Sequence, residues 1–348
     1  MLQRSSLPIT LVVFGLAVDA PPPARTESLN DLPQARVEVL AAEGELAIEL
    51  APVDLPAGMA HHGGRQPPVA VAELPLSGAV YGFRVEVVDS AGRVLPAELV
   101  HHFNLIDPAH RELFLPISRR LIAAGKETGT VRMPRLLLGF PVRKGERLVA
   151  SVMLQNPTAV AYRGARTRLV LLYTPARRPW PVFQVFPWQL DVAFPVGDKS
   201  FDLPPGRSTR SYEGSPAVPG TIAAVGGHVH QYGRSIELAD AATGAVIYRA
   251  TPVTDSAGRV LSMPIGRLYG WTRLGARIVP EHRYRVTVEY DNPTGHVLKA
   301  GGMGVVAGLF IPDRGTTWPA ADTTDLLYRR DLLHALRRLG GSPEHTHH

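Results

Sequence analysis

Short apolar or alternating segments, separated by turn residues, follow one another along almost the whole chain. Side chains that alternate between apolar and polar types are typical of strands with one buried face, and short continuous apolar runs are typical of fully buried strands. The pattern predicts an all-β protein. The segments that carry it most clearly are residues 84–88, 99–105, 113–117, 221–230, 235–238 and 245–249.

Two segments have a helical rather than a strand pattern. Residues 121–125 predict at most a turn or two of helix. Near the C-terminus, Thr324 and Asp325 precede leucines at helical spacing up to Leu339, and Gly340-Gly341 follows. We expect this short C-terminal helix to pack its leucine face on the last sandwich; binding of a partner is the alternative.

The chain contains an internal repeat. Residues 147–158 read RLVASVMLQNPT and residues 283–294 read RYRVTVEYDNPT, so each copy is an alternating strand that ends in an Asn-Pro-Thr turn. A glycine-containing stretch and an apolar strand that ends in proline follow each copy, at 169–175 and 305–312, and a Met-Pro pair precedes each. Three landmarks in one order predict two tandem jelly-roll-like β-sandwiches.

A second repeated segment, DSAGRVL, occurs at residues 89–95 and 255–261 and predicts one hairpin turn used twice. Residues 175–195 are the predicted linker between the halves and contain the aromatic stretch WPVFQVFPW at 180–188. We expect these rings to fill the contact between the two sandwiches; an exposed docking surface is the alternative.

Length and composition narrow the possibilities. A chain of 348 residues suits two domains, and 32 prolines with 33 glycines favour many short strands. The absence of cysteine excludes disulfides, zinc sites with cysteine ligands and blue-copper sites. The net charge is +6, but the arginines are scattered without a basic run, so no nucleic-acid partner is expected.

The N-terminus has the layout of a secretory signal peptide. Arg4 precedes an apolar run at residues 7–18, and small residues then precede Pro21-Pro22-Pro23. We therefore expect a periplasmic or extracellular protein, with an uncleaved membrane anchor as the alternative. The predicted organisation is residues 1–24 as signal peptide or anchor, 25–180 and 181–320 as the two sandwiches, and 321–348 as the helix and a histidine-containing tail.

The strongest chemical signal is the segment Gly226-Gly227-His228-Val229-His230. Residues two apart on a strand share a face, so the two imidazoles can bind one ion. The alternative is an ordinary pair of surface or core histidines. Because the pair ends an otherwise apolar strand, we favour a metal site in the second sandwich.

A third ligand is available after the second Asn-Pro-Thr turn. Met303 lies between Gly302 and Gly304, where a methionine has little core to fill. Two imidazoles and a thioether suit copper, Cu(I) above all, better than zinc or magnesium. His296 is the competing third ligand.

The order of these motifs resembles the ascorbate-dependent type II copper monooxygenases, the peptidylglycine α-hydroxylating and dopamine β-hydroxylating enzymes. The resemblance covers most of the chain and is strongest from about residue 203 to 312. It implies that His228, His230 and Met303 form the site where oxygen and substrate react, and that His101 and His102 belong to a second, electron-supplying copper site.

The second site departs from the family pattern. No histidine lies between His110 and His228, so its third ligand is missing. On a regular strand His101 and His102 point to opposite faces, and a bulge or twist would be needed for both to bind one ion. We therefore expect one copper site and an incomplete second one, in an exported copper-binding protein of the monooxygenase type. The alternative is a non-enzymatic accessory subunit docked on a membrane-bound partner complex.

Overall fold

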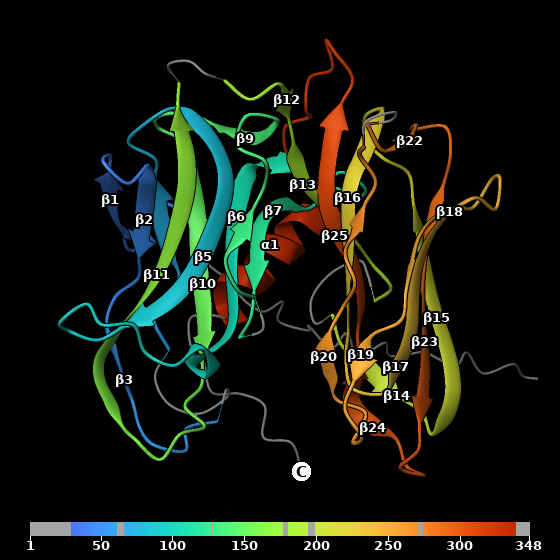
Figure 1. Ribbon diagram of the computed structural model, residues 1–348, viewed down its shortest axis with the longest axis horizontal. Coiled ribbons are helices and arrows are strands. Elements are labelled where there is room, and N and C mark those ends of the chain that lie inside the picture. The colour runs from blue at the N-terminus through green and yellow to red at the C-terminus, as the bar shows by residue number, and fades with distance from the viewer. Residues whose placement is uncertain are drawn as a thin grey trace, which may run out of the picture.

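The computed structural model describes residues 29–60, 66–126, 128–176, 180–193, 199–270 and 274–338. Within these residues the protein is all-β, as the sequence predicts: two β-sandwiches lie side by side and one short helix follows them (Figure 1). The predicted signal peptide or anchor, His61, His62 and the histidines of the tail lie outside the described residues. No helix of the described part of the chain has the length and hydropathy needed to cross a membrane.

The first sandwich consists of two facing sheets. The larger sheet has the strand order β1-β2-β11-β5-β9-β12, with β3 on β11 and β8 on β5. Its strands are β1 (Arg36–Leu40), β2 (Glu45–Glu49), β3 (Val53–Leu55), β5 (Gly78–Val88), β8 (Val131–Arg132), β9 (Leu138–Val142), β11 (Tyr162–Pro175) and β12 (Phe183–Gln184). The smaller sheet has the order β4-β10-β6-β7, from β4 (Ala70–Glu73), β10 (Arg147–Leu154), β6 (Val100–Arg111) and β7 (Ser118–Ala124), and a 3-10 turn, η1 (Ala97–Leu99), precedes β6.

The second sandwich has a similar construction. The sheet nearer to the first sandwich has the order β13-β25-β16-β21, with β22 on β16 (Figure 1). Its strands are β13 (Phe186–Asp191), β16 (Gly220–Val229), β21 (Gly266–Arg267), β22 (Ala276–Ile278) and β25 (Gly304–Pro312). The opposite sheet has the order β15-β23-β17-β18, from β15 (Gly206–Gly214), β17 (Gly233–Asp240), β18 (Val246–Ala250) and β23 (Tyr284–Asn292). Two small ribbons pair β14 (Phe201–Leu203) with β24 (Leu298–Gly302) and β19 (Val253–Thr254) with β20 (Val260–Ser262).

The repeated DSAGRVL segments form the same turn twice. In each, an aspartate oxygen accepts the backbone N–H groups two and four residues later: Asp89 at 2.9 and 2.9 Å, Asp255 at 3.0 and 2.9 Å. The glycine at the fourth position has a positive φ in both turns, 81° for Gly92 and 75° for Gly258. One turn chemistry therefore serves both halves, as the sequence predicts.

The predicted strand at residues 113–117 is wrong. These residues are the connection between β6 and β7, closed by the hydrogen bond of the Glu112 N–H to the Ile117 carbonyl (2.8 Å). Leu113, Phe114 and Leu115 are buried, with Ile117, in the core of the second sandwich. Connecting loops usually lie on the surface, where such apolar residues would be unusual. Here the loop belongs to the first sandwich but is buried in the core of the second.

The short helix predicted at residues 121–125 is also wrong, because these residues belong to β7 up to Ala124. Pairing with β6 places Ile122 opposite Leu105 and Ala124 opposite Phe103. So short a segment gains little from helical hydrogen bonds on its own, whereas a neighbouring strand satisfies its backbone groups at once.

The predicted linker at residues 175–195 contains two strands. β12 joins the first sandwich in parallel with β9, and β13 forms the edge of the second sandwich beside β25. An edge position tolerates Pro187, which has no N–H to donate. The rings are divided: Trp188 fills the second core, whereas Phe186 lies in the contact between the sandwiches, as expected.

That contact is built around a buried arginine. The guanidinium carbon of Arg119 lies 5.3, 5.4 and 5.2 Å from the ring centres of Phe140, Phe186 and Trp318, and its Nη2 donates to Asp107 at 2.5 Å. Aromatic faces attract a cation most strongly where water is excluded, and Arg119 is only 3% exposed. The side chain therefore joins rings of both sandwiches.

The C-terminal helix, α1 (Leu326–Arg338), begins where the sequence predicts, because Asp325 Oδ1 accepts the N–H groups of Leu327 (2.7 Å) and Tyr328 (3.2 Å). Its predicted packing on the last sandwich is correct only for Leu327, which packs against the second core; the rest of its apolar face is placed differently. The helix lies on the first sandwich, where Leu336 packs on an apolar patch of Val69, Ile106 and Val149. These side chains form a cluster separate from the first core, and α1 covers them together with Leu29 and Leu32.

Candidate metal centre

The two central histidines lie at the end of β16. Val229 between them is buried in the second core, whereas His228 and His230 are half-buried, as alternation along a strand requires. Their imidazole centroids are 5.5 Å apart, and the ring planes are at 88° to each other. The strand therefore brings the two rings together, as the His-x-His pattern predicts.

This separation fits binding of a single ion. A nitrogen ligand lies roughly 2.0–2.1 Å from the metal, so the centre of its ring lies about 3 Å away. Two rings on one ion therefore have centroids no more than about 6 Å apart. The pair His228 and His230 is inside that limit.

Met303 lies across from His230. β16 and β25 pair in antiparallel register, with His228 opposite Val305 and Val229 opposite Gly304. Continued by one residue, the same register places Met303 opposite His230. β24 ends just before Met303 and β25 begins just after it, so the methionine stands at a break between two strands.

The glycines beside Met303 face the protein core. A Cβ on Gly302 would collide with the ring of Phe201, and one on Gly304 would lie 2.9 Å from Val288 and 3.0 Å from Val192. Because neighbouring side chains on extended backbone point to opposite sides, we infer that Met303 points away from the core, to the side of His228. Close packing against the core thus explains why both positions are glycine. The same packing orients the Met303 side chain away from the core.

One hydroxyl connects the two segments. Tyr290 Oη accepts the backbone N–H of His230 (2.9 Å) and that of Met303 (2.9 Å), and it donates to the Met303 carbonyl. Tyr290 is 2% exposed and comes from β23, in the opposite sheet. Burial raises the pKa of Tyr290, so its hydroxyl keeps its proton and can donate at neutral pH.

Backbone strain is concentrated beside this group. Among the described residues, the only non-glycine positive φ angles are those of Tyr232 (68°) and Ala300 (50°). Tyr232 is two residues after His230, and Ala300 is three residues before Met303. Such conformations cost free energy and are frequent at functional sites. Both chain segments that supply the candidate ligands are therefore strained next to them.

His296 lies in the second Asn-Pro-Thr turn. Its ring Nδ1 lies 3.0 Å from the carbonyl oxygen of Thr294, its own carbonyl accepts the side-chain amide of Asn292 (2.9 Å), and its side chain is exposed. These contacts stay within the Asn-Pro-Thr turn. The structure thus places His296 in a turn, whereas Met303 is tied to His230 through Tyr290.

His101 and His102 lie at the start of β6, where the ladder with β10 is irregular. Val100 pairs with Leu154 and His102 with Met153, so His101 has no residue opposite it. This is the bulge that the sequence requires before both rings can share a side. Their centroids are 4.2 Å apart with planes at 48°.

Across the described residues, no three side chains of the His, Cys, Asp and Glu types come together as a metal site. Within the described part of the chain, neither histidine pair is therefore completed to a metal-binding group of three by another imidazole or a carboxylate. The pair at His228 and His230 has the thioether of Met303 as a neighbouring donor by register. For the pair at His101 and His102, the sequence offers His61 and His62 as further imidazoles, and these two residues are outside the described residues.

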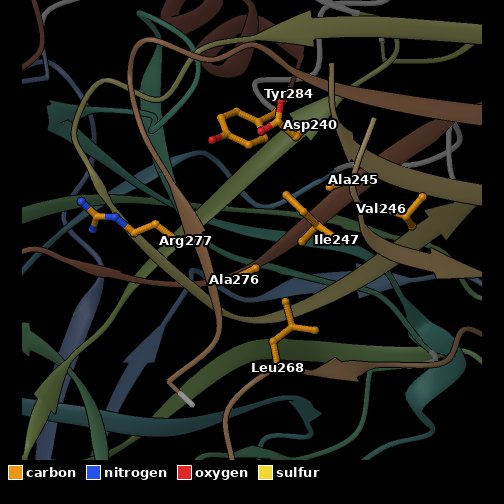
Figure 2. Close-up of a pocket in the computed structure, with 8 residues that line it drawn as sticks. All are labelled: Asp240, Ala245, Val246, Ile247, Leu268, Ala276, Arg277 and Tyr284. Atoms are coloured by element: carbon orange, nitrogen blue, oxygen red, sulfur yellow. The ribbon is translucent and has the colours of Figure 1, made fainter. Parts of the chain in front are cut away.

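A cavity of about 340 Å³ lies elsewhere in the second sandwich, between β18 and β22. Figure 2 shows Asp240 and Tyr284 at one end of it and Leu268 at the other. Its polar groups are already engaged: Asp240 binds His282 (2.7 Å) and two backbone N–H groups, and Arg277 binds Asp313. The cavity therefore offers a ligand little free hydrogen-bonding capacity.

Sequence reasoning missed Tyr290. A signal for it existed, because Tyr290 lies at an inward-facing position of an alternating strand, and a buried tyrosine hydroxyl needs a hydrogen-bond partner. The repeat also places a leucine, Leu154, at the equivalent position of the first half. Neither observation indicates which backbone groups the hydroxyl would reach.

No protein-family model matches the chain, and no curated protein matches its sequence. Among solved structures, peptide: N-glycanase F is 10% identical with a TM-score of 0.36, over 75% of this chain and 95% of its own. A structure of infectious bursal disease virus, Gx strain, is 12% identical with a TM-score of 0.21 (89% and 90% covered). The VP2 subviral particle of that virus is 13% identical with a TM-score of 0.24 (85% and 76% covered). Likeness this weak carries no conclusion about function.

Proposed function

We propose that this protein binds one copper ion through the imidazoles of His228 and His230 and the thioether of Met303. The observation that carries the proposal is the shared hydroxyl of Tyr290, which hydrogen-bonds the backbones of His230 and Met303. It holds the methionine segment beside two imidazoles whose separation suits a single ion.

The donor set favours copper over other metals. A thioether is a soft ligand that suits Cu(I), whereas magnesium and calcium prefer carboxylate and carbonyl oxygens. Structural zinc sites usually have four cysteine, histidine or carboxylate ligands, and the described residues contain no cluster of three such side chains. Two imidazoles and one thioether leave a coordination position open.

The activity proposed for this site is oxidation of a C–H bond to C–OH by a monooxygenase-type reaction. Dioxygen would supply one oxygen atom to the product and the other would leave as water, with two electrons from an external reductant such as ascorbate and two protons. Bound copper would supply one-electron chemistry between Cu(I) and Cu(II). This step rests on the family resemblance of the motifs, as does an electron-supplying role for His101 and His102. The bulge at His101 and the 4.2 Å ring separation are compatible with a metal there, but a third ligand is missing from the described residues.

Location outside the cytoplasm is part of the proposal. It rests on the N-terminal sequence, where Arg4 and an apolar run precede small residues and three prolines. N-terminal sequencing of protein from its native source tests it. A chain that begins after about residue 20, or an intact chain recovered with the membrane, supports export; an intact soluble cytoplasmic chain contradicts it.

The decisive experiment is a copper titration. The tail histidines His345, His347 and His348 can bind metal themselves, so all three are first replaced by alanine. This tail variant is titrated with Cu(II) in air and with Cu(I) under anaerobic conditions against a chromogenic competitor. We expect tight binding that His228→Ala and His230→Ala each abolish.

The matched control is His282→Ala, which removes a half-exposed histidine tied to Asp240 and should leave copper binding unchanged. Binding that survives loss of both His228 and His230 would contradict the proposed site. A tail variant that binds no copper would leave the accessory-subunit hypothesis as the better account of the chain.

A further inference from the structure

The hydroxyl of Tyr290 uses its whole hydrogen-bonding capacity on two residues. A phenol has one O–H donor and two acceptor lone pairs. Here the lone pairs accept the N–H groups of His230 and Met303 at 2.9 Å each, and the donor binds the Met303 carbonyl. The two backbone nitrogens are thus no further apart than two hydrogen-bond lengths.

This contact replaces a missing part of the sheet. The ladder between β16 and β25 ends with Val229 opposite Gly304, one pair before His230 and Met303. Beyond that pair, no strand of the described structure includes either residue. The distance between the two candidate ligand segments therefore depends on a side-chain hydroxyl and not on regular strand pairing.

The ring that carries this hydroxyl is itself fixed. Tyr290 lies in the second core and packs edge-on against Phe201, with ring centroids 5.9 Å apart. Phe201 also fills the space beneath Gly302, where a Cβ would collide with its ring. Because Phe201 touches both, the position of the Tyr290 hydroxyl and the path of the methionine segment are coupled.

At the position equivalent to Tyr290, the first half has a leucine and therefore no hydroxyl. The repeat places Leu154 where the second half has Tyr290. Leu154 pairs with Val100, the residue just before the bulge at His101. The backbone N–H and carbonyl of Leu154 instead bind the side-chain amide of Gln66, at 2.7 and 2.9 Å. The three-bond hydroxyl contact is thus present in the half that carries the His-x-His pair and Met303.

From this geometry we infer that Tyr290 is a positioning residue, which sets the reach of the Met303 thioether to copper bound by His228 and His230. The inference rests on the proposed copper site. Its consequence is selective. His228 lies within β16 and His230 follows that strand directly, whereas Met303 stands at the break between β24 and β25 and takes two of the three hydroxyl contacts. Removal of the hydroxyl should therefore affect the sulfur ligand more than the nitrogen ligands.

The test uses Tyr290→Phe in the full chain with the tail histidines replaced. Phenylalanine keeps the packing on Phe201 and loses only the hydroxyl. X-ray absorption of the Cu(I) form should show copper–sulfur scattering in the parent protein and none in Tyr290→Phe. Cu(I) affinity should fall roughly 10–100-fold, the usual loss when an outer partner of a ligand is removed, while Cu(II) affinity stays within about threefold of the parent.

Tyr284→Phe is the matched control. Tyr284 is buried on the same strand, and its hydroxyl accepts the Val279 N–H at 3.0 Å, so the variant loses one hydrogen bond of a buried tyrosine hydroxyl away from the site. We expect thermal stability to fall in both variants, less in Tyr284→Phe, and copper–sulfur scattering to stay unchanged in Tyr284→Phe. This comparison separates positioning of Met303 from general loosening of the fold.

The double variant Tyr290→Phe/Met303→Ala gives a second readout. If Tyr290 acts through Met303, the double variant should bind Cu(I) no more weakly than Met303→Ala. Copper–sulfur scattering that persists in Tyr290→Phe, or additive losses in the double variant, would overturn the role of Tyr290 alone. A parent protein that binds no copper would overturn the proposed function as well.

Discussion

Asn156 and Asn292 make the same hydrogen bonds in the two halves of the chain. The side-chain amide of Asn156 donates to the carbonyls of Leu55, Pro56 and Val160, and that of Asn292 donates to those of Leu203, Pro204 and His296. In both turns the asparagine oxygen accepts the hydroxyl of the threonine two residues later at 2.7 Å. Each asparagine thereby joins its own turn to a distant Leu-Pro segment, which explains why the Asn-Pro-Thr motif is repeated.

Replacement of either asparagine should destabilise the fold by a similar amount. Asn156→Ala and Asn292→Ala each leave three carbonyl acceptors without their donor, at a cost of about 2–4 kcal/mol in the free energy of unfolding. Substitution by aspartate should cost at least as much, because it sets an acceptor oxygen against those carbonyls. Urea denaturation measures the change; Gln155→Ala, at a more exposed neighbouring position, is the control. A loss under about 0.5 kcal/mol, typical of surface substitutions, would contradict the role of these amides.

Met303→Ala should separate the two oxidation states of copper. A thioether binds Cu(I) better than Cu(II), so the variant should lose Cu(I) affinity and keep most of its Cu(II) affinity. His228→Ala should abolish binding of both. Competition titrations under anaerobic and aerobic conditions measure the two constants. Equal losses for both ions, or none, would show that Met303 is not a ligand.

Gly302→Ala should be strongly destabilising. The added Cβ would collide with the ring of Phe201, which packs against Tyr290 in the core. We expect a loss of about 1–3 kcal/mol, the usual cost of overpacking. Gly129→Ala is the control, because no atom lies within 4 Å of its Cβ position. Thermal melts that give the same midpoint for both variants would contradict this explanation of the glycine.

Glu112 should make stability depend on pH. Burial raises its pKa from 4.5 to about 7, so between these values the folded protein holds a proton that the unfolded chain has released. Its stabilising contribution is therefore complete below pH 4.5 and is lost as the pH rises to about 7, by at most about 3 kcal/mol. Asp191, whose pKa burial raises to about 6, acts in the same direction.

Glu112→Gln removes one of these titrations. The glutamine can still accept the Arg120 N–H, which Glu112 accepts at 2.7 Å, but it has no proton to release. The decline in unfolding free energy between pH 4.5 and 7 should become shallower, and the remainder should disappear in Glu112→Gln/Asp191→Asn. Denaturation curves at several pH values measure the slope. An unchanged slope in Glu112→Gln would contradict the raised pKa.

Much of the local structure could be predicted from the sequence, because the relevant interactions are short in range. Alternation predicts strands such as β23, whose side chains are buried and exposed in turn. The aspartates of the two DSAGRVL turns and Asp325 at the start of α1 bind backbone groups only a few residues away. The convergence of the rings of His228 and His230 follows from the two-residue period of a strand.

Only the tertiary structure decided which apolar surfaces pack against each other. The apolar pattern of residues 113–117 indicates that they are buried, but it does not indicate in which core. They are buried in the core of the second sandwich, although the strands on either side of them belong to the first. The leucines of α1 require an apolar surface; the first sandwich supplies it for Leu332 and Leu336, and the second core for Leu327. Periodicity describes one segment at a time, whereas a burial partner depends on which surfaces the rest of the fold leaves uncovered.

The same distinction holds at the candidate metal centre. The sequence determined the donor types, two imidazoles and a thioether, and the two-residue spacing that brings His228 and His230 together. Only the tertiary structure placed the hydroxyl of Tyr290 between His230 and Met303, and only it gave β6 the bulge at His101. Both depend on the register of strands far apart in the chain, and register follows from packing of a whole sheet on its core rather than from any single motif.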